Sequence, residues 1–142
     1  MTYYRYKGGI DGFVSGSQKL HNNEISIIHD LTPIIVQFGT ENKALSESTG
    51  RIYTRFSHKG VDLVSTPWVR FFTRLEKIQG GVENEWKMLS LEVIYMFDTL
   101  VPTIPAPLAL DFSIVENTHR SYKCIAWHIA QFGVVVWDDL YS

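Results

Sequence analysis

The middle of the chain alternates between residues of opposite character, which is the pattern of β-strands with one buried face. Three segments show this alternation: residues 44–56, 61–76 and 86–97. Short polar stretches that contain glycine separate the segments, as expected of hairpin loops. We therefore predict a curved antiparallel sheet with one buried face and one partly polar face.

An apolar run precedes these segments, at residues 25–38, and its β-branched residues favour a further strand. Pro33 is the discordant residue in this run. Proline has no backbone donor for a strand ladder, so it predicts either an edge strand or a bulge at this point. Residues 39–42 are typical of the turn that leads into the next strand, which gives four strands in sequence.

After the strands, Pro102 is followed by two more prolines within five residues, and these end the sheet and begin an irregular connection. A helix is predicted at residues 121–132, with Ser121 as N-cap and Gly133 in the C′ position. Its apolar face packs back over the sheet. That face consists of Tyr122, Ile125, Ile129 and Phe132.

With 142 residues, the chain is expected to form a single domain, divided into an entry segment (1–24), the sheet (25–98) and a helical extension (99–142). Hydrophobic residues make up 45% and charged residues 20%, which is ordinary for a folded protein. The net charge of −2 comes from 13 basic and 15 acidic side chains that are interspersed. This balance predicts neither nucleic acid nor a membrane as a partner.

Cys124 is the lone cysteine, so no intramolecular disulfide can form, and a reducing, cytoplasmic location fits best. The histidines have neither the i, i+4 nor the carboxylate spacing of a metal site. Gly8-Gly9 and Gly80-Gly81 lack the lysine and hydroxyl residue of a phosphate-binding loop. We therefore expect no metal and no cofactor.

Three segments carry a family resemblance: SESTGRI at 46–52, RFFTRLEK at 70–77 and EWKMLSLEVIY at 85–95. They resemble the long strands of SnoaL-like proteins of the nuclear transport factor 2-like superfamily, including the scytalone-dehydratase-like members of fungal secondary-metabolite clusters. Residues 98–102, 120–122 and 138–140 are similar to the C-terminal extension of those fungal proteins. The resemblance spans residues 25 to 140.

This resemblance implies an α+β fold shaped like a cone, in which a curved antiparallel sheet wraps helices and encloses an apolar pocket. Many such proteins pair through the outer face of the sheet. Members of the family carry long additional helices at the N-terminus, and this chain offers only residues 1–20 for them. Two interpretations follow: either the gene model has lost its first exon, or the cone is shortened and open.

The alternation of the strands indicates which side chains line the expected pocket. If the apolar side chain of Val69 points inward, its neighbours on the same face of the adjacent strands do so as well. The pocket is then mostly apolar, as is usual for a small-molecule site. The predicted substrate-binding residues are Ser48, Val69, Phe71, Thr73, Leu91 and Val93.

His29 is the candidate acid/base residue, because the dehydratase-like members carry a histidine at the corresponding place and histidine titrates near neutral pH. Tyr95 could donate a hydrogen bond to a developing enolate oxygen. Asp98, at the rim of the sheet, would act as a second base or orient His29. The alternatives are structural: His29 at the end of a strand, Tyr95 in the core, and Asp98 as a cap of a helix or turn.

The resemblance and the pocket together predict a cofactor-independent isomerase, cyclase or dehydratase that acts on a polyketide- or terpenoid-like intermediate. The polar pair of the dehydratase falls here at Val69 and Phe71, which argues against that enzyme's own substrate. The alternative function is a non-catalytic module of the same fold that binds a small molecule or dimerises.

The opposite face of the sheet carries Trp68 and Phe72, which are large for a solvent-exposed surface. They favour a homodimer through this outer face. Arg70 and Glu92 are expected to form a cross-strand ion pair on the same face.

Overall fold

The computed structural model describes residues 10–21, 25–40, 42–78 and 85–132 of the chain. Its order of elements is helix, five strands, two short 3-10 helices and a second helix. The bounds are α1 Ile10–His21, β1 Ser26–Leu31, β2 Ile35–Phe38, β3 Lys43–His58, β4 Val61–Ile78, β5 Glu85–Pro102, η1 Ser113–Val115, η2 Arg120–Tyr122 and α2 Lys123–Ala130. The predicted helix at residues 121–132 therefore begins with a 3-10 turn.

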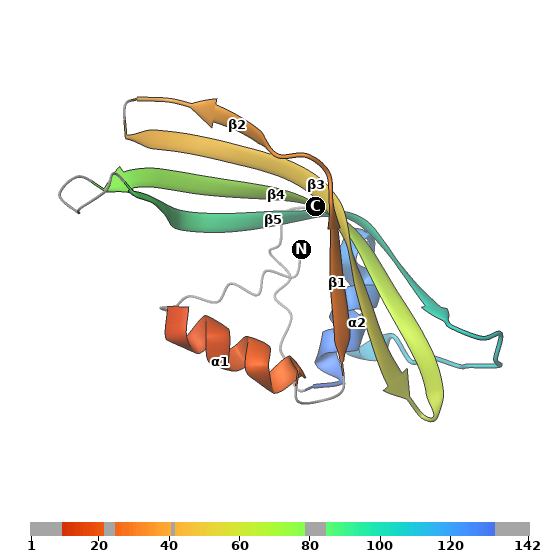
Figure 1. Cartoon of the computed structure of the whole chain (residues 1–142). Coiled ribbons are helices and arrows are strands. Elements are labelled where there is room, and N and C mark those ends of the chain that lie inside the picture. The colour runs from red at the N-terminus through yellow and green to blue at the C-terminus, as the bar shows by residue number, and fades with distance from the viewer. Residues whose placement is uncertain (1–9, 22–24, 41, 79–84, 133–142) are drawn as a thin grey trace.

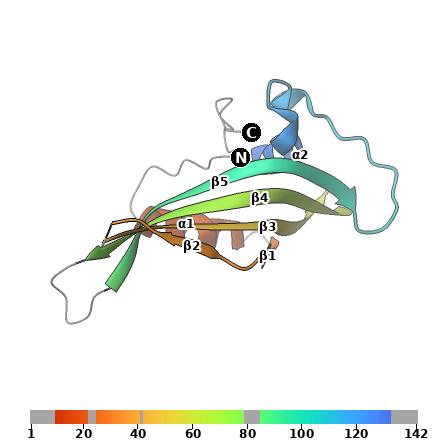
Figure 2. The same ribbon diagram turned by 90° about the horizontal axis from the view of Figure 1, so that it is seen from above.

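All strands belong to one antiparallel sheet in the order β1-β3-β4-β5, with β2 also paired to β3. Figures 1 and 2 show an open sheet with few helices, so the predicted curved antiparallel sheet of an α+β chain is confirmed. The predicted first strand is two strands, and both lie along the same edge of β3.

Pro33 causes this division. The β1 pairing places Leu31 opposite Gly50, whereas the β2 pairing places Ile35 opposite Glu47, so residues 32–34 contain one residue more than the facing part of β3. An extra residue in one strand of an antiparallel pair is a β-bulge. The expectation of an edge strand or a bulge at Pro33 is met on both counts.

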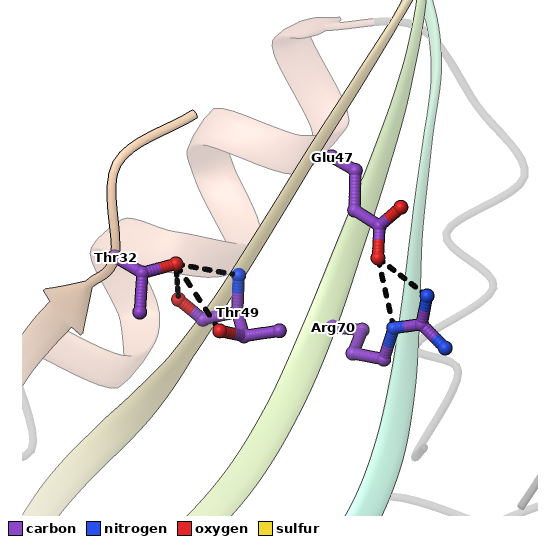
Figure 3. Close-up of polar contacts among 4 residues, drawn as sticks. All are labelled: Thr32, Glu47, Thr49 and Arg70. Atoms are coloured by element: carbon purple, nitrogen blue, oxygen red, sulfur yellow. Dashed lines mark hydrogen bonds and ion pairs between the residues drawn. The ribbon is translucent and has the colours of Figure 1, made fainter. Parts of the chain in front are cut away.

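Thr32 maintains the pairing immediately before the bulge (Figure 3). Its backbone amide donates to the Thr49 carbonyl at 2.8 Å, and its Oγ1 accepts from the Thr49 amide at 3.1 Å. The Oγ1 hydroxyl also donates to the Thr49 carbonyl at 3.0 Å. The Thr32 side-chain oxygen thus accepts the bond of the Thr49 amide next to the bulge.

Lys59 and Gly60 form the two-residue turn between β3 and β4. Both have positive φ, 50° and 76°. Two-residue hairpin loops with positive φ at both positions match the right-handed twist of the flanking strands, and glycine adopts this conformation without strain. The expected hairpin loop is therefore shorter than residues 57–60, because the strands continue to His58 and resume at Val61.

The long strands bend about midway, so the sheet has two arms (Figure 1). The covered arm consists of β1 and residues 50–58, 61–69 and 95–102, and the open arm consists of β2 and residues 43–49, 70–78 and 85–94. A second bulge, between Trp68 and Val69 in the pairing with β5, lies where the arms meet. Bulges sharpen the local bend of a strand, which accounts for the change of direction.

Gly50 lies at the same bend. A Cβ atom at this position would be 2.5 Å from the carbonyl oxygen of Asp30 and 3.2 Å from the Cα of Leu31. No other residue type fits so close to a neighbouring backbone, so the glycine permits the end of β1 to approach β3 this closely.

The hydrophobic core lies between the covered arm and the C-terminal segment, which crosses the sheet and ends in α2 (Figure 2). Leu63, Val69 and Tyr122 are fully buried. The Trp127 Nε1 donates to the Asp111 carbonyl at 2.7 Å and joins α2 to the connecting segment. Ile125 and Ile129 are buried as predicted, whereas the expected core residue Phe132 is exposed and Gly133 lies outside the described residues.

Candidate functional site

We call the face of the sheet that carries Val69 and packs against α2 the inner face, and the opposite one the outer face. Residues directly opposite each other in an antiparallel pair point to the same face, so the register assigns every strand residue to one of them. His29 is opposite Ile52, which packs against the core. His29 is therefore on the inner face, but it is exposed and on the edge strand of the sheet.

Tyr95 is on the inner face as well, opposite Val69, and only 7% of it is exposed. Its ring lies 6.4 Å from the ring of Tyr122, centroid to centroid, beneath the C-terminal segment. The phenol of Tyr95 is therefore part of the packed interior of the covered arm.

Asp98 lies at the N-terminus of α2. Its Oδ2 accepts a hydrogen bond of 2.7 Å from the backbone amide of Ile125, whereas the N-cap residue Tyr122 makes no capping bond with its side chain. A carboxylate at this point satisfies a free helix amide and complements the helix dipole. Ser121, the predicted N-cap, is instead inside η2, so that prediction was wrong.

Burial raises the pKa of Asp98, and the hydrogen bond from Ile125 opposes that shift. Burial also raises the pKa of the neighbouring Cys124 thiol to about 12, and the negative charge of Asp98 adds to the rise. A thiol with such a pKa is protonated at neutral pH and is a poor nucleophile. Cys124 therefore provides no reactive thiolate at the start of α2.

His29 is thus separated from the two residues predicted to act with it, which both lie on β5. His29 and Asp98 lie in one row of the inner face, but β3 and β4 run between their strands, and three strand spacings amount to about 14 Å. A general acid or base must reach its proton at hydrogen-bond distance, about 3 Å. His29 is therefore not in contact with Tyr95 or Asp98.

The predicted substrate-binding residues do share one face. Ser48 is opposite Phe71, Phe71 is opposite Val93, and Thr73 is opposite Leu91. With Val69 in the same alternation, all six residues point to the inner face, as the sequence pattern predicted. They lie on both sides of the bend, and α2 covers the part that belongs to the covered arm.

His128 is a buried group that sequence reasoning did not single out. Its ring stacks on Phe56 at 3.8 Å between centroids, and it is only 3% exposed. Among the described residues, neither ring nitrogen has a hydrogen-bond partner, and the same holds for the buried Tyr122 hydroxyl and the Ser65 Oγ. Burial lowers the pKa of His128 to about 4, so the ring is neutral at pH 7.

The outer face combines aromatic side chains with ion pairs. Trp68 and Phe97 stack at 4.3 Å between ring centroids with an interplanar angle of 15°. The guanidinium of Arg70 lies over the ring of Phe72, 5.0 Å from its centroid. We call Trp68, Phe72 and Phe97 the aromatic patch.

Arg70 pairs with Glu47 through its Nε and Nη2 (Figure 3), and not with Glu92 as predicted. Glu92 pairs with Arg74 at 3.3 Å. The register makes both Glu47 and Glu92 diagonal neighbours of Arg70, and Arg70 pairs with the one on β3 while Arg74, two residues further along β4, takes Glu92.

A cleft of about 520 Å³ lies at the free end of the open arm, next to the turn between β2 and β3. Its walls come from β2, β3, β4 and β5 and contain none of the six predicted substrate-binding residues. The described residues around it are mostly apolar, and the register places Phe38 and Leu75 on the inner face but Lys43 and Arg74 on the outer face. Lys43 and Arg74 carried no signal in the sequence, because strands that are distant along the chain bring them together.

In the part of the chain that the structure describes, no group of three or more histidine, cysteine or carboxylate side chains could hold a metal ion. None of the described helices is both long and apolar enough to cross a membrane. Comparison with known proteins finds no matching family model and no matching curated protein.

Proposed function

We propose that this chain is a non-catalytic association module that forms a homodimer through the outer face of its sheet. The observation that carries the proposal is the aromatic patch, where two large rings stack on a face that none of the described helices is seen to cover. Phe97 is 49% exposed although it is among the largest apolar side chains. Aromatic residues are enriched in the buried centres of interfaces.

The size of the outer face supports a dimer. Strands β3, β4 and β5 have 16, 18 and 18 residues. At about 3.3 Å per residue and 4.8 Å between strands, their common face measures about 50 by 15 Å. This area of about 750 Å² is close to the roughly 800 Å² that each partner contributes to a stable interface.

The charges of this face are also compatible with a second copy. Among the described residues, the outer face carries five ion pairs, so its acids and bases are balanced and two copies meet without net repulsion. A two-fold dimer buries the same patch on both partners, which requires such self-complementarity. The pairs are Asp30–Arg51, Asp62–Arg55, Glu47–Arg70, Glu92–Arg74 and Glu85–Lys87.

The fold that we propose for the module is the SnoaL-like cone, supported by the bent antiparallel sheet and by the sequence resemblance of its three long strands. Isomerase, cyclase or dehydratase activity finds less support, because His29 lies three strands away from Tyr95 and Asp98 and because Asp98 caps α2. A fold can be shared without its reaction, which depends on the site.

The test compares the mass in solution of the native chain with that of a variant that carries a charge in the aromatic patch. Phe97→Glu places a carboxylate at the centre of the proposed interface, where an unpaired charge is costly to bury. We expect a dimer for the native chain and a monomer for the variant, measured by light scattering after size-exclusion chromatography.

The control is Ile104→Glu, which changes a side chain that is 74% exposed and lies in the connecting segment. It adds the same charge outside the sheet and should leave the dimer intact. A native chain that is monomeric, or a Phe97→Glu variant that remains dimeric with a native circular dichroism spectrum, would contradict the proposal.

A further inference from the structure

We propose that the desolvated core of the dimer lies on the covered arm, along β4 and β5, and that the open arm contributes its polar rim. This inference rests on the proposed dimer, and it names the part of the outer face that meets the second copy. We call the six residues of this part the uncharged ladder. They are Val64, Thr66, Trp68, Phe97, Thr99 and Val101.

The register arranges the ladder in three rows that cross from β4 to β5. The rows are Val64–Val101, Thr66–Thr99 and Trp68–Phe97. Residues directly opposite each other in an antiparallel pair point to the same face, so these side chains form one continuous surface without charge. The fully buried core of an interface has this character, because charged residues are depleted there.

The same two strands carry charges on the outer face of the open arm. Every row from the bend to the free end contains at least one charged side chain. These rows are Arg70–Ile94, Phe72–Glu92, Arg74–Ser90, Glu76–Lys87 and Ile78–Glu85. Polar and charged side chains are typical of the rim of an interface, where water still reaches them. The distribution of charge along β4 and β5 therefore places the core on the covered arm.

The ladder is accessible in the single chain. Phe97 is 49% exposed and Val101 is 50% exposed. Thr99, between them on β5, is exposed as well, whereas Thr66 is already buried within the chain. A second copy would remove the exposed apolar side chains from water, which is the main driving force of most protein association.

Two ion pairs border the ladder on the side of β3. Arg51 pairs with Asp30, and Arg55 pairs with Asp62. The two arginines lie opposite the β4 residues of the first and the last row of the ladder. Each pair is neutral as a unit, so the border of the ladder can face its own copy in a two-fold dimer without net repulsion.

The first test places the same charge in each arm. Val101→Glu introduces a carboxylate into the ladder, and the matched control Leu45→Glu introduces one into the outer face of the open arm. Both residues are exposed and apolar. We expect Val101→Glu to raise the Kd of the dimer about 100-fold or more and Leu45→Glu to change it less than about threefold, because an unpaired charge is costly where water is excluded. Sedimentation equilibrium measures both values.

The second test measures burial without adding a charge, so it remains decisive if Val101→Glu fails to fold. Cys124→Ser removes the lone thiol, and Thr99→Cys then adds one to the ladder. We expect a maleimide to label this thiol about tenfold more slowly at protein concentrations well above the Kd than below it, because the dimer covers the ladder. Leu45→Cys in the same background should react at equal rates at both concentrations.

The outcomes separate this inference from the dimer itself. A native chain that is monomeric would refute the dimer and the placement of its core together. If the native chain is dimeric, equal effects of the two glutamates, or a larger effect of Leu45→Glu, would overturn the placement and leave the dimer standing. Equal labelling rates of the Thr99→Cys thiol in the monomer and the dimer would overturn it as well.

Discussion

The two arms of the sheet are made from the same strands, yet they differ in what covers them. On the covered arm, Leu63 is fully buried beneath the C-terminal segment. On the open arm, Leu89 is 59% exposed, and Met88 and Phe38 are exposed as well. The alternation of apolar residues is similar in both arms, so this pattern identifies strands but does not determine which part of a strand becomes core.

We infer that, on the inner face, the two arms have different roles, the covered arm in stability and the open arm in binding. Stability comes from the covered arm, where apolar side chains leave water, and burial of this kind is the dominant favourable term in folding. The open arm contributes much less burial, and its apolar surface at the free end remains accessible for binding. The outer face extends over both arms and carries the aromatic patch near the bend.

Substitution of one leucine in each arm tests this difference. The two variants should differ most in their free energy of unfolding. Leu63→Ala removes a fully buried side chain, and we expect a loss of about 2–5 kcal/mol in the free energy of unfolding. Leu89→Ala changes an exposed residue and should alter the free energy by no more than about 0.5 kcal/mol. Urea denaturation of both variants would measure the difference, and equal losses would contradict it.

The buried histidine of the covered arm should make its stability depend on pH. The pKa of His128 is about 4 in the folded chain and about 6.5 when unfolded, so the unfolded chain binds more protons below pH 6.5. The stability is complete above pH 6.5 and falls as the pH decreases towards 4. The difference between the folded and unfolded pKa of His128 corresponds to a loss of roughly 3 kcal/mol in the free energy of unfolding at low pH.

Comparison with His128→Phe isolates this contribution, because phenylalanine can keep the stacking on Phe56 and does not titrate. Urea denaturation at about pH 7 and about pH 4.5 should show a smaller loss of stability for the variant than for the native chain. If both proteins lost the same free energy, His128 would not be the group responsible.

The bend that separates the arms can be tested at Gly50. An added Cβ would lie 2.5 Å from the Asp30 carbonyl oxygen, so Gly50→Ala requires β1 to move away from β3. We expect a destabilisation of about 1–3 kcal/mol, as for other overpacked positions. Gly16→Ala is the control, since no atom lies within 4 Å of its added Cβ, and helical alanine is favourable. A Gly50→Ala variant as stable as the native chain would show that the contact between β1 and Gly50 is loose.

A smaller effect is expected at the cap of α2. Asp98→Ala removes the acceptor of the Ile125 amide and should cost about 0.5–2 kcal/mol, the usual range for a helix cap. Asp111→Ala removes a similar bond, to the Ser113 amide at 2.9 Å, at an exposed position, and should cost less. Thermal unfolding followed by circular dichroism would rank the two variants, and the reverse order would argue against the capping role.

The strands were predictable from the sequence because alternate residues of a strand point to opposite faces of the sheet, so the apolar residues recur at every second position. The pattern correctly placed Ser48, Phe71 and Val93 on a common face, and Pro33 correctly indicated the break in the edge strand. These features depend on local spacing and on the missing amide of proline, both of which are visible in the chain itself.

The contacts between distant segments were not predictable in the same way. The partner of Arg70 depends on the register of two ladders, and the cap of α2 comes from Asp98, 27 positions before Ile125. The cleft likewise requires β2, β3, β4 and β5 to meet at one end of the sheet. Sequence spacing carries no direct signal for such pairs, so the candidate site became visible only in the folded chain.

The central claim is that the outer face of the sheet joins two copies of this chain. Sedimentation equilibrium of the native protein over a range of concentrations tests it most directly, since the mass is obtained without a label or a variant. The account predicts a species of twice the 16.3 kDa mass of the chain that dissociates on dilution. A mass of 16.3 kDa at every concentration would contradict the account.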